Sequence, residues 1–492
     1  MKEREDNLAA GARGGAVAFL LKISNTGLGF LNQVILARIL GAGGLGEVIL
    51  AITVVRISSQ IAKFGMEETM MKFIPLYLDG GDESRIKGTV SFVLRFCLLF
   101  SLAFMIMVFL SSRFISLTIF HSEGLLKLLP VIVIALPAWV LRDVAGGVLR
   151  GYRDAFRALL PEALVSPLVK ITIFLLLTLK GVSPLYAVVA FVTGEIISCA
   201  AALHFLRAKL HMLRHIQGHC DRRKVLEVAY TIIFTGMSVL LYTQADIWIL
   251  GMFTDAETVG IYGIASKLVL LVYFPMMAFS AIVPSVISSV HASGNHAELQ
   301  EVVRESTRWI LSLAMPIILL LLLEGETILR IFFGPEFAVG YPVVVILIAG
   351  QLIKAGAGLI GMILQMTGEH RVYMKVNIFW GLLNILLNVL LVPRYGMIGA
   401  AAATALCLVM VDIICIVIIQ RRLAILTLAR GLQFDIVFVS IVATIYLLVS
   451  YNNLHMAQHM LLAAALAVYL WKSLKYNDIP WRLLLASQDK AQ

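Results

Sequence analysis

Five basic residues lie deep inside long apolar stretches of the chain, where a positive charge has few ordinary uses. They are Lys22, Arg56, Arg142, Lys267 and Lys354. A cation at the centre of a membrane-spanning helix costs about 2.5 to 3.5 kcal/mol on insertion scales, so each one needs a partner or a water-filled cavity. In such a cavity, lysine and arginine can bind anionic groups through charge-assisted hydrogen bonds.

Three further basic residues, Lys63, Arg95 and Lys170, lie nearer to the ends of apolar stretches. A lysine or arginine within about two helical turns of a membrane surface can keep its stem in hydrocarbon while its charge reaches the headgroups. We therefore expect these three side chains to extend to the membrane surface.

Polar residues recur with helical spacing beside the five deep cations, which predicts helices with polar faces turned to a cavity. Lys22 and Asn25 share one such face, and Arg56 and Ser59 share another. Similar polar faces accompany Lys267 and Lys354. The alternative is ordinary hydrogen bonding between helices by the uncharged members, which is common and modest in energy.

Asp246 is the acid that best fits a site for a proton or a coupled cation. It ends a polar stripe that begins at Thr231 and repeats at helical spacing. Asp143 directly follows Arg142, so local charge compensation explains it. The other acids within apolar stretches are Glu162, Glu195 and Asp412.

The sequence lacks the usual signatures of enzymatic chemistry. No GxxxxGK[ST] phosphate loop occurs, which argues against direct ATP hydrolysis. The five cysteines form no CxxC pair and are expected to act as small apolar residues. His211, His215, His219 and Cys220 could form a metal-binding face only if their segment is helical, and a solvated loop is the favoured interpretation. We therefore expect no enzymatic activity, no cofactor and no metal.

The elements that must position the deep cations are membrane-spanning helices. Hydrophobic residues make up 60% of the 492 residues and charged residues 14%, and the mean hydropathy is +0.92. Soluble proteins have about 25% charged residues. Because the apolar runs are about 20 residues long, they predict helices and not the short alternating strands of a barrel. We expect an all-α polytopic membrane protein with about 14 spans.

The distribution of Lys and Arg predicts the orientation. With the N-terminus in the cytoplasm, the predicted inner segments hold 26 of these residues and the outer loops hold 6. This is a strong positive-inside bias, so both termini are expected in the cytoplasm, in a multi-pass protein of the cell (inner) membrane. The net charge of +10 is then explained by topology and lipid contact, and nucleic acid is not an expected partner.

An internal repeat predicts how the spans are grouped. NQVILARILGAGGLGEV from Asn32 resembles DIWILGMFTDAETVGIY from Asp246, and the alignment pairs Gly46 with Gly260. We expect two pseudo-symmetric six-helix bundles and two additional C-terminal helices. The predicted domains are a cytoplasmic segment (1–14), a first bundle (15–206), a basic cytoplasmic linker (207–224), a second bundle (225–419), two added spans (433–474) and a cytoplasmic tail (475–492).

Several segments resemble a known family. LARILGAGGLGEV (36–48), KFIPLYLDGGDESRIKG (72–88) and VGIYGIASKLVLL (259–271) are similar to segments of oligosaccharide flippases of the polysaccharide transporter family. That family lies within the multidrug/oligosaccharidyl-lipid/polysaccharide exporter superfamily. The resemblance covers most of the chain, about residues 15 to 475.

The resemblance implies alternating access around a cationic cavity between two bundles. By matching position, Lys22, Arg56 and Lys267, with Arg142 and Lys354 as further candidates, would bind the substrate, and we add Asn25 from its spacing. The expected activity moves polyprenyl-(pyro)phosphate-linked oligosaccharide from the cytoplasmic to the outer leaflet for cell-surface polysaccharide or glycan assembly. Its partners would be that lipid-linked oligosaccharide, membrane lipids and other polysaccharide-assembly proteins.

Two other functions remain open at this level. A cation-coupled multidrug exporter of the same superfamily is disfavoured, because such exporters usually have twelve helices and an acid-lined cavity. A membrane-embedded polysaccharide polymerase or ligase is disfavoured by the short predicted outer loops.

Overall fold

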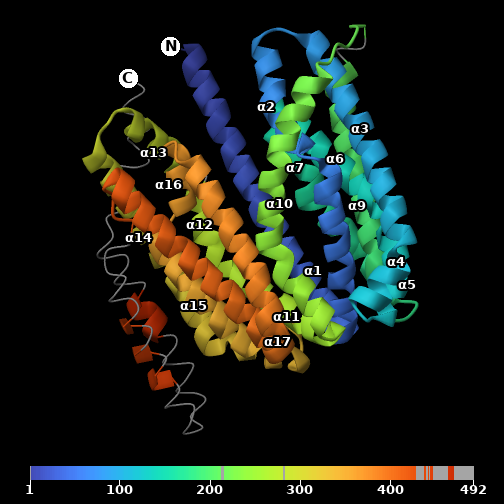
Figure 1. The fold of residues 1–492 in the computed structure, drawn as a ribbon, viewed down its shortest axis with the longest axis vertical. Coiled ribbons are helices and arrows are strands. Elements are labelled where there is room, and N and C mark those ends of the chain that lie inside the picture. Colours follow the sequence, from blue (N-terminus) through green and yellow to red (C-terminus); the bar gives the residue numbers. More distant parts are fainter. Residues whose placement is uncertain are drawn as a thin grey trace. The chain divides into compact units, whose positions relative to one another are not determined.

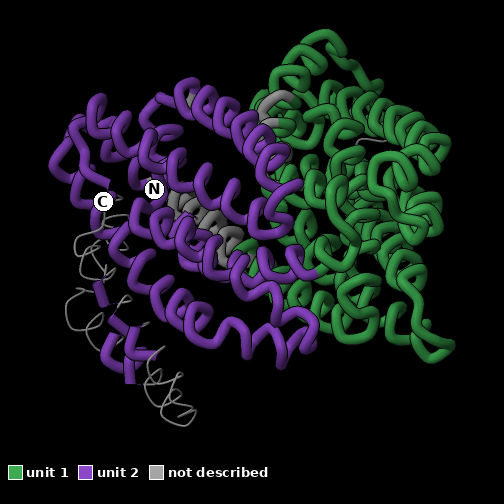
Figure 2. The backbone as a smooth tube through the Cα atoms, turned by 60° about the horizontal axis from the view of Figure 1, so that its bottom comes forward, with its two compact units in different colours: residues 1–260 green, residues 261–492 purple. Residues whose placement is uncertain are grey.

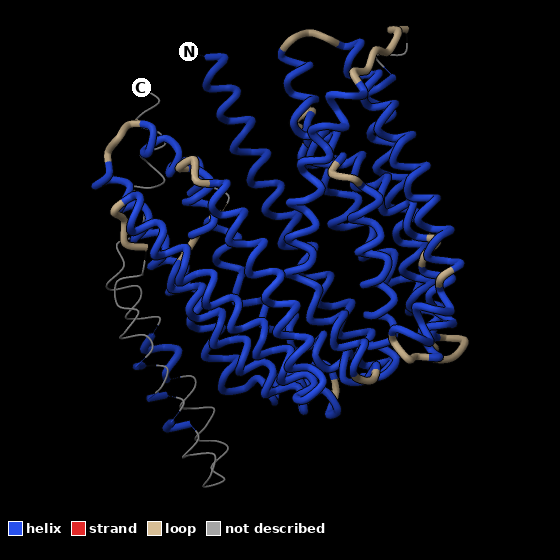
Figure 3. The backbone as a smooth tube through the Cα atoms, viewed as in Figure 1, coloured by secondary structure: helices blue, strands red, loops and turns tan. Residues whose placement is uncertain are grey.

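The computed structural model describes residues 2–211, 215–280 and 283–427, together with short helical pieces at 437–438, 441–442, 444–446 and 464–469. The described chain is built from helices joined by short loops and contains no strand in those ranges (Figure 3). Contacts divide the protein into two compact units, residues 1–260 and 261–492 (Figure 2).

Unit 1 begins with a long broken helix and continues through shorter helices to α10 (Figure 1). Its elements are α1 (Lys2–Lys63), α2 (Met66–Asp79), α3 (Glu83–Leu110), α4 (Ser112–Phe114), η1 (Ile115–Ile119), α5 (Glu123–Ile132), α6 (Ala135–Gly151), α7 (Ala155–Leu160), η2 (Pro161–Val165), α8 (Ser166–Thr178), α9 (Pro184–His211) and α10 (Arg222–Phe253). The segments η1 and η2 are π-helical.

Unit 2 begins within α11 and ends with a second long broken helix. Its elements are α11 (Ala256–Val269), η3 (Leu270–Tyr273), α12 (Phe274–Phe279), α13 (Val283–Ala292), α14 (His296–Ile328), η4 (Leu329–Phe333), η5 (Pro335–Gly340), α15 (Tyr341–Ala357), α16 (Ile360–Met366) and α17 (His370–Leu423).

The two longest helices are each interrupted by a glycine. Gly41 in α1 has φ 70° and ψ 178°, and Gly396 in α17 has φ 53° and ψ −133°. Both conformations have positive φ, which a residue with a Cβ adopts only at a cost. Each of these long helices is therefore two helical segments joined at a glycine.

The described helices confirm a polytopic membrane protein. Eight are long and apolar enough to cross a membrane, or nine if the pair α5 and α6, bent by 50°, forms one span. Because α1 and α17 each contain a break, this count is consistent with the expected 14 spans but does not establish that number. The last two expected spans, within 433–474, lie outside the described residues except for the short pieces named above.

A very close backbone contact within unit 1 involves the two glycines that the repeat aligns. A Cβ at Gly46 would overlap the backbone carbonyl of Ala256, and a Cβ at Gly260 would overlap the carbonyl of Ala42. The second part of α1 therefore packs backbone to backbone against the start of α11. Only glycine permits this approach, because any side chain would hold the two segments apart.

Candidate functional site

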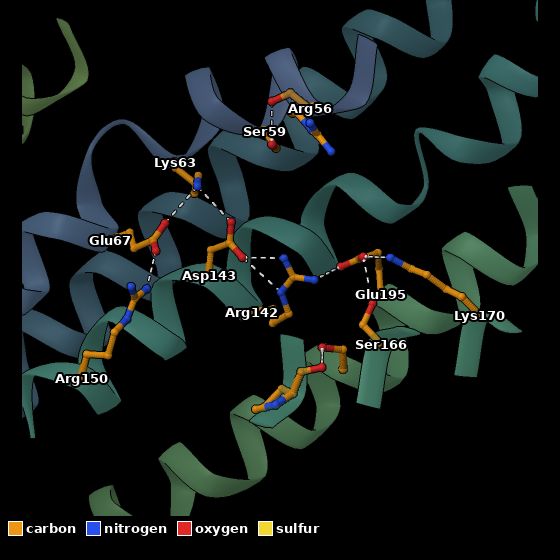
Figure 4. Close-up of polar contacts among 12 residues, drawn as sticks. Arg56, Ser59, Lys63, Glu67, Arg142, Asp143, Arg150, Ser166, Lys170 and Glu195 are labelled. Atoms are coloured by element: carbon orange, nitrogen blue, oxygen red, sulfur yellow. Dashed lines mark hydrogen bonds and ion pairs between the residues drawn. The ribbon is translucent and has the colours of Figure 1, made fainter. Parts of the chain in front are cut away.

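Seven charged side chains of unit 1 form one connected set, which we call the charge network (Figure 4). Five helices contribute to it: α1, α2, α6, α8 and α9. Its members are Lys63, Glu67, Arg142, Asp143, Arg150, Lys170 and Glu195.

Arg142 is the centre of the charge network. Its Nη2 and Nε donate to Oδ1 of Asp143 at 2.7 and 3.1 Å, and its Nη1 donates to Glu195. Only 6% of Arg142 and 1% of Glu195 is exposed. A charge so deeply buried is tolerated because it is paired and hydrogen-bonded.

One arm of the network runs from Asp143 to the end of α1. Nζ of Lys63 donates to Oδ2 of Asp143 and to Oε2 of Glu67, at 2.9 Å in each case. The other carboxylate oxygen of Glu67 pairs with Arg150. Because Asp143 and Glu67 each bind two cations, this arm ties α1 and α2 to α6.

The other arm lies around Glu195 of α9. Nζ of Lys170 donates to Oε1 of Glu195 at 2.6 Å, and the Ser166 hydroxyl donates to the same oxygen at 3.3 Å. Lys170 also lies 4.1 Å from the centre of the Phe191 ring, a distance at which a cation is attracted to the ring face.

The charge network corrects two expectations about individual residues. Lys63 and Lys170 were expected to extend to the membrane surface, but both bind carboxylates of neighbouring helices. In the sequence, the two lysines and their partners Asp143 and Glu195 all lie in apolar stretches. Because a buried charge requires a partner, the sequence could have predicted that these lysines and acids pair. Which acid meets which cation depends on helix packing, and the spacing along the chain does not contain that information.

Arg56 differs from the members of the network, although it lies near them in Figure 4. It projects from α1 one turn before the buried Ser59, whose hydroxyl donates to the Arg56 carbonyl at 2.8 Å. Its side chain is exposed, and no carboxylate among the described residues lies within ion-pair distance. Glu195 acts on its charge only at longer range.

The other predicted residues of unit 1 lie in α1, α6 and α10. Lys22 is exposed and Asn25 is half-buried, both in the part of α1 before Gly41. Arg142 is engaged in the charge network, as described above. Asp246 of α10 is buried, and its carboxylate accepts a hydrogen bond from the backbone N–H of Ile247 at 2.8 Å.

In unit 2, Lys267 of α11 and Lys354 of α15 are both half-buried. Nζ of Lys354 lies 5.5 Å from the centre of the Tyr273 ring. The buried Asp412 of α17 interacts electrostatically with Lys354. Asp412 therefore lies near Lys354, one of the predicted cations. The sequence pattern did not single out Asp412 as a candidate.

Sequence comparison places the chain in a family. A profile described as "Polysaccharide biosynthesis protein" matches residues 12–291, more than half of the protein. The chain belongs to the polysaccharide biosynthesis protein family. A second profile, MatE, matches residues 231–390 of this family member.

One relative of this chain comes from Haloferax volcanii and bears the name "Probable low-salt glycan biosynthesis flippase Agl15". It is 23% identical over 420 residues, which cover 80% of each chain. A second H. volcanii protein, "Probable flippase AglR", is 28% identical over 179 residues, or 36% of this chain and 37% of that relative.

The solved structures that resemble this family member show its fold. The lipid II flippase MurJ in an inward closed conformation aligns with a TM-score of 0.71 and 16% identity, covering 93% of this chain and 98% of MurJ. An inward-facing multidrug resistance MATE transporter of the MOP superfamily aligns with a TM-score of 0.67 and 14% identity, covering 83% of this chain and 98% of the transporter. The chain thus has the fold of these two proteins, which the family resemblance in its sequence predicted.

Proposed function

We propose that this protein is a flippase that moves polyprenyl-(pyro)phosphate-linked oligosaccharide across the membrane by alternating access. The proposal is supported by membership of the polysaccharide biosynthesis protein family and by two relatives whose names contain "flippase". Transport of a whole molecule needs no covalent step, and accordingly we assign the protein no catalytic residue.

One structural observation carries the proposal. Arg56 is an exposed cation in a membrane-spanning helix, while the buried cations beside it are neutralised by carboxylates. An exposed guanidinium at that depth suits a ligand that brings its own negative charge. A (pyro)phosphate is such a group, and arginine binds it through two parallel hydrogen bonds.

The physical need for the protein follows from the substrate. The polyprenyl chain is stable in the bilayer, but phosphates and sugar hydroxyls would lose their hydration in hydrocarbon, which costs several kcal/mol per unpaired group. We propose that Lys22, Arg56, Lys267 and Lys354 contact the phosphates and Asn25 contacts hydroxyls. Arg142 is retained as a candidate, although its contact with substrate would require its present ion pairs to rearrange.

The orientation of the protein in the membrane and the direction of transport are also part of the proposed function. We place the protein in the cell membrane with both termini in the cytoplasm, and we keep the predicted division into two six-helix bundles and two added spans. With the cytoplasm negative, an anionic headgroup that moves outward gains about 2.3 kcal/mol per charge per 100 mV. Export is then favoured by the membrane potential even without a coupled ion.

The test is to measure which leaflet exposes the lipid-linked oligosaccharide in cells that lack the protein. We expect completed units to accumulate on the cytoplasmic side, protected from a glycosidase or lectin added outside. Expression of the wild-type chain should restore their exposure. If completed units reach the outer face at the normal rate without the protein, the flippase proposal is wrong.

A cation-coupled multidrug exporter is the second candidate, favoured by the MatE profile over residues 231–390 and by the buried Asp246. The same cells distinguish the two functions. Under this alternative, toxin sensitivity would change while the leaflet distribution of the oligosaccharide would not.

A further inference from the structure

A cavity of about 630 Å³ lies in unit 1 between the first half of α3 and the connection that leads into α10. Its wall combines positive charge from Lys87, Arg95 and Arg222 with the rings of Phe92 and Phe96. None of these residues belongs to the charge network or to the predicted substrate contacts.

The connection into α10 is held against α3 by hydrogen bonds and by a close backbone contact. The Ser84 hydroxyl donates to the Gln217 carbonyl at 2.6 Å, Lys87 Nζ donates to the Ile216 carbonyl at 2.7 Å, and the His219 N–H donates to the Ser84 carbonyl at 3.0 Å. A Cβ at Gly88 would overlap the backbone of His219. The shape of the cavity is therefore built into the fold.

Two arginines in this cavity lack an internal counter-ion. Arg95 and Arg222 are both exposed, and no carboxylate of the described residues lies within ion-pair distance of either. The adjacent Asp221 accepts from the backbone N–H of Lys224 at 3.2 Å and so caps α10. Burial raises the pKa of the Cys220 thiol, which therefore stays neutral and does not offset the positive charge.

The position of Arg95 along its helix indicates what would compensate it. Arg95 lies twelve residues after Glu83, about 18 Å along α3 at 1.5 Å per residue. The next turn carries Leu98 and Leu99, which are 38% and 69% exposed, as expected for a helix in contact with lipid. The guanidinium of Arg222 lies 5.6 Å from the centre of the Phe92 ring, which directs a second cation to the same wall.

We propose that this cavity binds an anionic phospholipid as a resident ligand. The headgroup phosphate would lie between Arg95 and Arg222 with Lys87 beside it, and an acyl chain would lie along Phe92, Phe96 and Leu99. Phosphate supplies the missing negative charge, and the apolar wall next to it distinguishes a lipid from a free ion. The proposal does not rest on the transport function, since it concerns binding alone.

The test is native mass spectrometry of the purified full-length protein titrated with phosphatidylglycerol, and separately with phosphatidylcholine. We expect the double variant Arg95→Gln/Arg222→Gln to bind phosphatidylglycerol about 30-fold more weakly, which corresponds to about 2 kcal/mol. Binding of phosphatidylcholine should not change. Arg113→Gln is the matched control, because Arg113 is an exposed arginine just after the other end of α3, outside the cavity.

Two further measurements distinguish a lipid site from a misfolded variant and from a general anion site. Arg95→Lys/Arg222→Lys should retain most of the affinity, which would show that the loss in the glutamine variant is due to charge and not to misfolding. Inorganic phosphate or glycerol phosphate in excess should not displace the lipid. Equal loss in Arg113→Gln, or full displacement by free phosphate, would overturn the assignment of a lipid site.

Discussion

At the scale of single residues, the cations in the apolar helices of unit 1 are of two kinds, paired and exposed. Lys63, Arg142 and Lys170 are bound by carboxylates from other helices, whereas Arg56 is exposed. A buried pair mainly holds helices together, because its charge is already neutralised. An exposed cation in a membrane span retains its capacity to attract an anion from outside the protein.

Replacement of Arg56 should therefore slow transport and leave stability unchanged. We expect Arg56→Gln to reduce transfer of lipid-linked oligosaccharide by at least tenfold, since a charge-assisted hydrogen bond contributes about 1.5 to 3 kcal/mol. The measurement is glycosidase accessibility of a labelled lipid-linked oligosaccharide in vesicles. Arg113→Gln removes an exposed arginine elsewhere and should transfer normally. Normal transfer by Arg56→Gln would contradict the assigned role.

Replacement of Glu195 should instead destabilise the fold. Glu195→Gln leaves Arg142 and Lys170 buried with one carboxylate fewer, and breaking a buried ion pair typically costs about 3 to 5 kcal/mol. The expected result is a clear fall in the thermal unfolding midpoint of the protein in detergent.

The control for Glu195 is the same substitution at Glu326, which pairs with Arg330 on the surface of unit 2. Both side chains of that pair are more than half exposed, so Glu326→Gln should cost at most about 1 kcal/mol. If the two variants unfold at the same temperature, the charge network does not stabilise the helices.

At the scale of helices, the glycines that follow Gly41 in α1 have unequal roles. A Cβ at Gly46 would overlap the carbonyl of Ala256, while a Cβ at Gly43 would meet nothing within 4 Å. Gly46→Ala must push the second part of α1 away from α11, and overpacking of this kind typically costs about 1 to 3 kcal/mol.

The two alanine variants form a matched pair that differs by three positions. We expect Gly46→Ala to lower the unfolding midpoint and the yield of folded protein. Gly43→Ala should be neutral or stabilising by about 0.5 to 1 kcal/mol, because alanine restricts the unfolded chain and favours helix. Equal behaviour of the two variants would show that the close approach is not important for folding.

At the scale of the whole molecule, composition and periodicity were sufficient to predict the fold class. Spans of about 20 apolar residues allow few structures other than helices, because backbone groups in lipid must be satisfied within their own segment. The contacts of Glu195 could not be predicted in the same way. Its partners lie on α6 and α8, and their meeting depends on helix rotation and register, which a single sequence does not specify.

The orientation of the chain in the membrane can be measured directly with reporters fused to its two ends. The bias of 26 against 6 basic residues predicts both termini in the cytoplasm. A phosphatase that is active only outside the cytoplasm should be inactive when fused to either end, and a cytoplasmic fluorescent reporter should be active at both. A phosphatase that is active at one terminus would reject the even number of spans.

The contact between Gly46 and Ala256, with its counterpart between Gly260 and Ala42, also constrains how the two repeats can evolve. Copies of a duplicated segment normally drift apart freely, because each mutation affects only one of them. Here each copy supplies a glycine whose missing side chain makes room for the backbone of the other. A side chain at either glycine meets a main-chain carbonyl of the other copy, and a substitution in that copy cannot remove a main-chain carbonyl, so the loss of one glycine is not compensated by a change in its partner segment.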